Sequence, residues 1–290
     1  MDDLARPYRS VLYIPGSNER ALEKAKGLAV DAIIFDLEDA VAIDAKAEAR
    51  ALVARMLSDG GFGGRFQIVR LNGMTTEWGA ADFDTIAAVG PQAILLPKVG
   101  SAAEIEAAAA RLDSIPACAG TKIWAMMETP QGILNAASIA GGPRMGGLVM
   151  GTNDLAKELM TRFRADREPM LTSLQLCLLA ARAAGIAIVD GVYNAFKDED
   201  GLRAECAQGR DMGFDGKTLI HPAQVAVANE AFAPSEADID LARRQIAAFE
   251  AAEAEGKGVA VVDGRIVENL HIVTARQTLA KADAIAALGG

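Results

Sequence analysis

The chain has 290 residues, of which 51% are hydrophobic and 28 are glycine, and its formal charge is −10 from 29 basic and 39 acidic residues. This length allows one large core, and α/β barrels of this size are commonly single domains. The negative charge argues against nucleic acid and against an anionic membrane surface as partners, because both would repel the chain. With only two histidines, a zinc or iron centre built on histidine is close to excluded.

The cysteines and the apolar runs indicate where the protein works. Cys118, Cys177 and Cys206 lie far apart and form no CxxC pair, as expected of reduced thiols inside a cell. The first seven residues lack the charged-then-apolar pattern of a signal sequence, and no apolar run reaches about 18 residues. We therefore expect a cytoplasmic protein with no membrane association.

Eight short apolar or β-branched segments recur along the chain, and helix-like stretches separate most of them. Each predicts a buried strand, and together they cover 10–16, 32–36, 66–71, 93–97, 122–127, 147–151, 186–190 and 216–220. The intervening stretches carry apolar residues at helical spacing, as in 18–28, 45–57, 101–112 and 172–184. This alternation implies parallel pairing through right-handed crossovers. Eight such units favour a (β/α)₈ TIM barrel over a doubly wound sheet.

Polar residues follow almost every predicted strand. In a parallel barrel the active site lies at the carboxyl ends of the strands, whereas a doubly wound sheet binds ligands only around its switch point. The pattern therefore supports a catalytic barrel. The residues concerned are Asp36 to Asp39, Arg70, Lys98, Glu128, Asp154, Asp190 and His221.

Two stretches of the barrel give weaker signals. Arg20 and Lys24 lie on the first predicted helix, just after the turn 15–18. Helix-start amides with cations one and two turns on could bind a phosphate, although an ordinary solvated helix face explains them equally well. His221, followed by Pro222, either orients a ligand or satisfies the end of the last strand.

Arg70 stands at the end of an otherwise apolar strand. A buried guanidinium is costly unless it pairs with an acid or with a bound carboxylate. The alternative to a ligand contact is a structural ion pair with Glu38 or Asp39. Asp36, Glu38 and Asp39 form a tight acidic cluster, which we expect to face the same site and to support its ligands.

Glu128 and Asp154 each follow a short apolar run, and these runs are the fifth and sixth predicted strands. Carboxylates at the ends of neighbouring strands can converge on one hard cation such as Mg²⁺ and leave its other positions to water and substrate. The alternative is that they are unrelated surface or capping carboxylates. Their matched positions favour a Mg²⁺-dependent enzyme that acts on an oxyanionic substrate.

The residues after Phe232 differ from the barrel repeat, so we predict a barrel over 1–232 and a C-terminal helical and β-turn arm over 233–290. Ser235 and Asp238 form a capping-box pattern at the start of a long helix that the glycines of 256–258 break. A two-stranded turn over 259–267 precedes a final helix over 271–287. This arm is either a lid or packing element, or it completes the active site of a neighbouring subunit.

Several of these motifs together resemble the citrate lyase β-subunit-like enzymes, also called the malyl-CoA and citramalyl-CoA lyase family, of the HpcH/HpaI aldolase-like barrels. They occur in the family's order and span nearly the whole chain. The matching pieces are Leu12-Tyr-Ile-Pro-Gly16, Phe35-Asp-Leu-Glu-Asp-Ala-Val41, Val69-Arg-Leu-Asn-Gly73, Leu96-Pro-Lys-Val99, Met127-Glu-Thr129, Gly151-Thr-Asn-Asp154 and Ile220-His-Pro222.

The resemblance implies a TIM barrel assembled as a homotrimer or homohexamer, with Mg²⁺, replaceable by Mn²⁺, at Glu128 and Asp154. It also implies that Arg70 contacts an α-keto acid and that coenzyme A lies across the barrel mouth near Lys24. The expected reaction is reversible Claisen-type cleavage of a short 3-hydroxyacyl-CoA, such as malyl-, methylmalyl- or citramalyl-CoA, to an acyl-CoA and the keto acid. The expected catalytic residues are Arg70, Glu268, Glu38 and Asp39, and those expected to bind substrate or CoA are Arg70, Lys24, Arg20, Lys98, His221 and Pro222.

One position departs from the family pattern. Relatives carry an Asp in a Gly-x-x-Val-Asp motif of the arm for proton transfer, whereas this chain reads Gly264-Arg-Ile-Val-Glu268. The extra methylene shifts the carboxyl group by about 1.5 Å, and displacement on that scale can cost on the order of 100-fold in rate.

Three alternatives to the lyase therefore stay open. A thioesterase on the same scaffold would hydrolyse malyl-CoA to malate and CoA, with Glu268 directing a water at the thioester or attacking it. A citrate lyase β subunit would act only on an acyl-carrier partner. A metal-dependent pyruvate aldolase on a related barrel would not need the CoA groove.

Overall fold

The computed structural model describes residues 6–288. Residues 1–5 and 289–290 lie outside that range, and with them most of the stretch on which the prediction of no signal sequence depends. The described chain forms two compact units, residues 8–232 and a second unit of residues 6–7 with 233–288. No helix within residues 6–288 is both long enough and apolar enough to cross a membrane.

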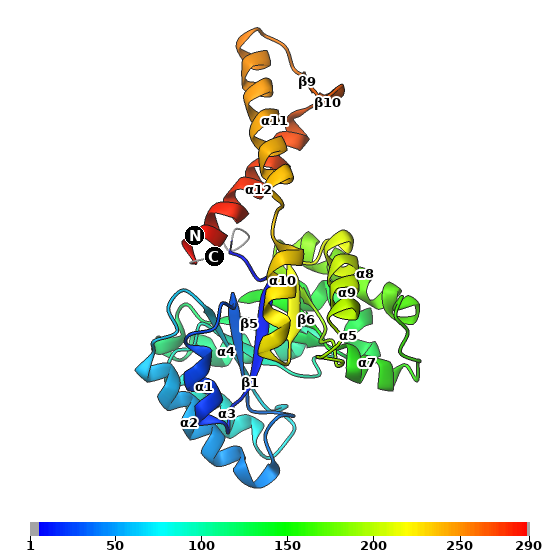
Figure 1. Cartoon of the computed structure of the whole chain (residues 1–290). Helices are drawn as coiled ribbons and strands as arrows, with labels where there is room; N and C mark the ends of the chain where they lie inside the picture. Colours follow the sequence, from blue (N-terminus) through cyan, green and yellow to red (C-terminus); the bar gives the residue numbers. More distant parts are fainter. Residues whose placement is uncertain (1–5, 289–290) are drawn as a thin grey trace. The chain divides into compact units, whose positions relative to one another are not determined.

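Eight parallel strands close into a barrel in sequence order, which confirms the predicted TIM-barrel fold (Figure 1). Each strand begins and ends within two residues of its predicted segment, because buried parallel strands are continuous apolar runs that are easily recognised. The strands are β1 (Ser10–Pro15), β2 (Ala32–Asp36), β3 (Phe66–Arg70), β4 (Ala93–Leu96), β5 (Lys122–Met127), β6 (Met145–Met150), β7 (Ala187–Asp190) and β8 (Gly216–Leu219).

Helices follow the strands and bury their apolar faces against the outside of the barrel. Local signals fix several of their ends: Asn18 and Thr129 cap α1 and α5 through side-chain oxygens, and Gly185 ends α8 in a left-handed conformation with φ of 68°. The helices are α1 (Glu19–Ala25), α2 (Lys46–Asp59), α3 (Gly79–Ala87), α4 (Ala102–Asp113), α5 (Pro130–Leu134), α6 (Ala136–Ala140), α7 (Thr152–Glu158), α8 (Leu171–Ala184), α9 (Glu199–Met212) and α10 (Val225–Phe232), with 3₁₀ turns at Ile43–Ala45, Pro116–Cys118, Glu168–Met170 and Pro222–Gln224.

Side chains alternate between the two faces of each strand, and this period of two decides which polar residues can reach the barrel interior. Val11, Ile34, Ile68 and Trp124 belong to the cluster that fills the barrel. Residues two or four positions further along the same strands therefore also point inward, towards the carboxyl end. They are Tyr13 on β1, Asp36 on β2, Arg70 on β3 and, on β5 and just past it, Met126 and Glu128.

The second unit consists of α11 (Glu236–Ala254), the antiparallel pair β9 (Ala260–Val262) and β10 (Arg265–Val267), and α12 (Asn269–Ala287). The predicted capping box of Ser235 and Asp238 is present. Asp263 and Gly264 both have positive φ, of 51° and 75°, as a two-residue hairpin turn requires. The final helix begins two residues earlier than predicted, because Glu268 forms a capping box with His271.

Candidate active site

A cavity of about 290 Å³ opens at the carboxyl ends of the barrel strands. Four of the predicted site residues line it: Asp39, Arg70, Glu128 and Asp154. Tyr13 also lines it, although it was not among the predicted site residues. The cavity therefore lies where a parallel barrel carries its active site.

Glu128 is a buried carboxylate without a basic partner. It is 1% exposed, and its Oε1 accepts a hydrogen bond of 2.7 Å from the backbone N–H of Lys98. No ion pair found in residues 6–288 includes it. Burial, followed by the negative charge of Glu38, raises its pKa to about 7, and Asp154 adds to the shift. A cation at this carboxylate would relieve both effects.

Asp154 lies in the first turn of α7 and is half-buried beside Glu128. The register of β5 and β6 pairs Met127 with Met150, so Gly151 comes directly alongside Glu128. A Cβ at Gly151 would lie 2.5 Å from Glu128 Oε2, which means that only glycine leaves this carboxylate its present position. Unpaired carboxylate oxygens with free space beside them suit a hard cation such as Mg²⁺.

The donor set is small. No group of three or more His, Cys, Asp or Glu side chains gathers into a metal cluster within the part of the chain that the structure describes. Glu128 and Asp154 would thus supply two ligands, and the remaining positions of an octahedral ion would go to water and substrate. The residues present fit a substrate-binding Mg²⁺ better than a closed structural site.

Arg70 is held by the acidic cluster that follows β2. Its Nε and Nη2 donate to the two carboxylate oxygens of Asp36 at 2.8 and 2.6 Å, and its Nη1 lies 2.9 Å from Glu38 Oε2. The register explains the first pair, because Asp36 and Arg70 are direct neighbours on β2 and β3. Burial alone would lower the pKa of Arg70, but the hydrogen bonds to Asp36 raise it well above its ordinary value. The guanidinium is therefore a permanent, oriented cation at the edge of the cavity.

Arg70 forms the ion pair with Glu38 that was the alternative to a ligand contact, and Asp36 is a further partner. Glu38 Oε2 lies 2.9 Å from Arg70 Nη1, whereas the bidentate partner is Asp36, which the sequence did not single out for this pair. Asp39 is largely exposed and lies 3.5 Å from Arg70 Nη1. Asp36 and Asp39 line the cavity and Glu38 does not, and the role of the cluster in catalysis stays a prediction.

Lys98 connects the acidic cluster to Glu128. Its Nζ lies 2.8 Å from Glu38 Oε1, and its backbone adopts a left-handed conformation with φ of 52°. That conformation costs a non-glycine residue about 1 kcal/mol. The same residue thus holds Glu38 through its side chain and Glu128 through its N–H, which the sequence alone did not reveal. Its predicted role in CoA binding stays a prediction.

The other predicted binding residues do not line the cavity. Arg20 and Lys24 are exposed on α1. His221 caps the following turn, because its Nδ1 accepts from the N–H of Ala223 at 3.1 Å, and its ring stacks on Phe196 at 4.6 Å between centroids. These contacts favour the alternative in which His221 satisfies the end of the last strand. The binding roles of Arg20, Lys24, His221 and Pro222 stay predictions.

Glu268 belongs to the second unit, where it is exposed at the start of α12. Its backbone N–H donates to His271 Nδ1 at 3.0 Å, so the side chain of His271 holds this helix start in place. The role of Glu268 in proton transfer remains a prediction.

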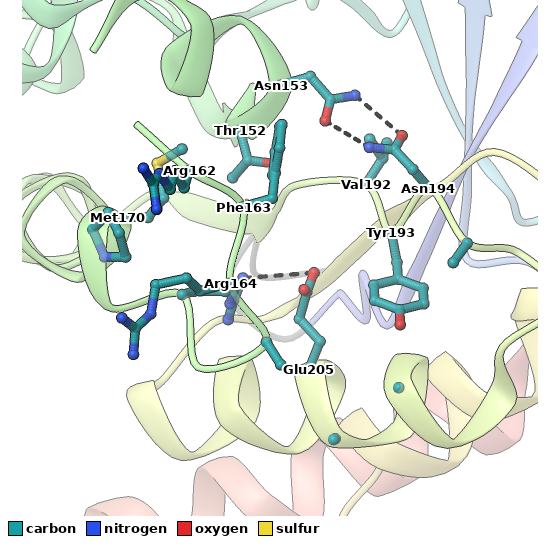
Figure 2. Close-up of a pocket in the computed structure, with 16 residues that line it drawn as sticks. Thr152, Asn153, Arg162, Phe163, Arg164, Met170, Val192, Tyr193, Asn194 and Glu205 are labelled. Atoms are coloured by element: carbon teal, nitrogen blue, oxygen red, sulfur yellow. Dashed lines mark hydrogen bonds and ion pairs between the residues drawn. The ribbon is translucent and has the colours of Figure 1, made fainter. Parts of the chain in front are cut away.

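A second cavity of about 420 Å³ shares four lining residues with the first: Thr152, Asn153, Val192 and Asn194 (Figure 2). The amide groups of Asn153 and Asn194 hydrogen-bond to each other, at 2.8 and 3.2 Å, and their side chains face each other in Figure 2. Because both residues line both cavities, this amide pair stands between them.

Asp190 is the strand-end carboxylate that does not reach the active-site cavity. It shares a face with Ile188, which packs outward, and is fully buried between the barrel and its helices. Arg167 Nη1 and Lys217 Nζ lie 2.7 and 3.2 Å from its Oδ2. Burial opposes ionisation, but these two cations hold the pKa of Asp190 below its ordinary value. Asp190 therefore stabilises the fold. Contrary to the expectation from the sequence, it does not line the active-site cavity.

Together, the closed parallel barrel and its carboxylate-lined cavity define the class of the protein as a TIM-barrel enzyme. The family model described as HpcH/HpaI aldolase/citrate lyase matches residues 9–222, and a second one, described as a C–C bond lyase of the TIM-barrel fold, matches residues 160–286. The chain belongs to the HpcH/HpaI aldolase/citrate lyase family, as the sequence motifs predicted.

Three proteins are similar to this chain over at least 96% of its length. A (3S)-malyl-CoA thioesterase of Cereibacter sphaeroides (strain ATCC 17029) is 69% identical over 283 residues, which are 98% of this chain and 97% of that protein. The citrate lyase subunit beta of Escherichia coli K12 is 35% identical over 286 residues, 96% of this chain and 94% of that protein. The solved structure of CitE from Mycobacterium tuberculosis with magnesium, acetoacetate and coenzyme A has a TM-score of 0.78 at 28% identity and covers 96% of this chain and 99% of that one.

Proposed function

We propose that this enzyme is a Mg²⁺-dependent thioesterase that hydrolyses (3S)-malyl-CoA to malate and free CoA. The observation that carries the proposal is the pair Glu128 and Asp154, unpaired with any base in the described chain and facing the oriented cation Arg70 across one cavity. The choice of hydrolysis rests on the 69% identical relative, which is named a malyl-CoA thioesterase. Lyase activity, which was the first expectation from the sequence, thus becomes the second candidate function.

Glu128 and Asp154 would hold the Mg²⁺ ion, or Mn²⁺ in its place. The ion would supply Lewis-acid charge to the oxygen atoms of the hydroxy-acid end of the substrate. The N–H of Lys98 keeps one oxygen of Glu128 fixed, which leaves Oε2 as the donor beside Gly151. This arrangement orients the donor before any ligand arrives.

Arg70 supplies the second positive charge. Asp36 fixes its plane through two hydrogen bonds, so the guanidinium does not need to reorganise when an anionic substrate enters. In hydrolysis a water oxygen attacks the thioester carbon, the carbon–sulfur bond breaks, and the thiolate of CoA takes up a proton. We propose Glu268 as the group that directs this water, with coenzyme A lying near Lys24, and a homotrimer or homohexamer as the working assembly.

The experiment is to incubate the purified protein with (S)-malyl-CoA and Mg²⁺ and to follow free thiol, malate, glyoxylate and acetyl-CoA together. Equal amounts of CoA and malate without glyoxylate support the thioesterase. Loss of that activity in EDTA and its return with Mg²⁺ support the metal site. Acetyl-CoA and glyoxylate without free thiol refute hydrolysis.

The second candidate is Claisen-type cleavage of the same ester, or of methylmalyl- or citramalyl-CoA. It is favoured by the match of residues 160–286 to the C–C bond lyase model. The similarity to citrate lyase subunit beta favours a variant of it, action on an acyl-carrier thioester. No turnover of the free CoA ester, with turnover of the carrier-bound one, would select that variant.

A further inference from the structure

Tyr13 brings a hydroxyl group to the floor of the active-site cavity. It points inward from β1, and its Oη donates to Met126 Sδ on β5 at 3.3 Å, so the contact crosses the barrel. Met126 lies two residues before Glu128 on the same inward face, which puts the hydroxyl below the level of the carboxylate pair. Both side chains line the cavity.

The acceptor that Tyr13 uses is a poor one. A thioether sulfur accepts hydrogen bonds weakly, so the hydroxyl loses little when it turns towards an oxygen atom in the cavity. Burial raises the pKa of Tyr13 above its ordinary value, although the charge of Arg70 opposes the shift. The hydroxyl therefore stays protonated at neutral pH and remains a donor.

The position of the ring is fixed independently of that hydrogen bond. The guanidinium carbon of Arg70 lies 4.9 Å from the centroid of the Tyr13 ring, a cation–π contact that holds the ring in place. Asp36 already occupies two nitrogens of Arg70. An anionic group that enters between Arg70 and Glu128 thus needs a further hydrogen-bond donor, and this donor must be neutral. The hydroxyl of Tyr13 is such a donor.

Three other neutral polar side chains of the cavity, Thr218, Asn153 and Asn194, already donate hydrogen bonds to protein groups. Thr218 Oγ1 donates to the backbone oxygen of Asp190 at 2.9 Å. Asn153 and Asn194 bind each other at the boundary with the second cavity.

We propose that Tyr13 is a substrate-binding residue whose hydroxyl donates a hydrogen bond to the carboxylate at the hydroxy-acid end of the substrate. This inference rests on the proposed function, in which that end of the substrate lies between Glu128, Asp154 and Arg70. The ligand class it selects is a short 2-hydroxy carboxylate, and Tyr13 limits how deeply that group enters the barrel.

The test compares Tyr13→Phe with Met126→Leu. The first keeps the ring under Arg70 and removes only the hydroxyl, whereas the second removes the thioether acceptor and keeps an apolar side chain of similar volume. The readouts are kcat and KM for (S)-malyl-CoA and, by calorimetry, binding of (S)-malate in the presence of Mg²⁺. Thermal unfolding of both variants checks that the barrel is intact.

Tyr13→Phe should weaken malate binding and raise KM by about tenfold to 100-fold, the range for a hydrogen bond to a charged group. Met126→Leu should change both by less than about threefold, because the hydroxyl keeps its ligand partner. Equal effects of the two variants would mean a packing role and would overturn the inference, as would unchanged binding in Tyr13→Phe or no malate binding to the wild-type protein. If malate binds as predicted but malyl-CoA is not hydrolysed, the proposed function fails and the role of Tyr13 in binding stands.

Discussion

Replacing Gly151 with alanine should displace the carboxylate of Glu128 and thereby weaken the metal site. The φ of Gly151 is −97°, which alanine adopts without strain, so the substitution acts through the added methyl group and not through the backbone. That methyl would lie 2.5 Å from Glu128 Oε2 and closer still to Glu128 Cβ, whereas ordinary contact begins at 3.4 Å. Glu128 must therefore shift by about 1 Å together with its carboxylate, a misplacement that can cost on the order of 100-fold in rate.

The assay is Mg²⁺-dependent release of CoA from (S)-malyl-CoA, with the Mg²⁺ concentration for half-maximal rate measured alongside. Gly151→Ala should lower kcat/KM by about 100-fold and raise the Mg²⁺ requirement. Gly120→Ala is the matched control, because nothing lies within 4 Å of the methyl that it adds. Activity of Gly151→Ala within about threefold of wild type, at an unchanged Mg²⁺ requirement, would refute the assignment of Glu128 Oε2 as a metal ligand.

Four further substitutions test the metal ligands, the buried ion pair of Asp190 and the arm. Glu128→Gln and Asp154→Asn should each abolish metal-dependent turnover at an unchanged melting temperature, and normal turnover in either would remove the metal assignment. Asp190→Asn should lower the free energy of unfolding at pH 7 by about 3 kcal/mol, because it leaves buried cations without their partner. The fold holds the pKa of Asp190 below its ordinary value. The stabilisation is therefore present above the unfolded pKa of about 4 and is lost as pH falls through the lower folded value. Urea titrations that give the same difference in unfolding free energy between wild type and Asp190→Asn at pH 7 and pH 3 would contradict the ion pair. Glu268→Gln should block turnover but spare malate binding, and mixing it with Glu128→Gln should restore activity if the arm acts in trans; no rescue in verified mixed oligomers would mean that Glu268 acts within its own subunit.

The barrel could be predicted from the sequence because its strands are short, buried apolar runs separated by helical periodicity. The position of Glu128 and Asp154 in one cavity also followed, since neighbouring parallel strands end at the same edge. Both inferences depend on local pattern and chain order alone.

Pairing between strands could not be predicted in the same way. The bidentate partner of Arg70 is Asp36 because the register of β2 and β3 sets them side by side, and register is not visible in one sequence. Asp190 was wrongly expected at the site for a related reason. Side chains alternate between the two faces of β7, and Asp190 lies on the face that points away from the barrel interior. Tyr13 was missed because an aromatic residue in an apolar strand looks like core until its hydroxyl is seen to face a cavity.

The most direct test of hydrolysis is turnover of (S)-malyl-CoA with Mg²⁺ in H₂¹⁸O, with the products analysed by mass spectrometry. Attack of water on the thioester carbon predicts one ¹⁸O atom in the carboxylate that malate gains, together with an equal amount of free CoA. Acetyl-CoA and glyoxylate as the only products, with no labelled malate, would contradict a thioesterase and establish carbon–carbon cleavage as the reaction of this cavity.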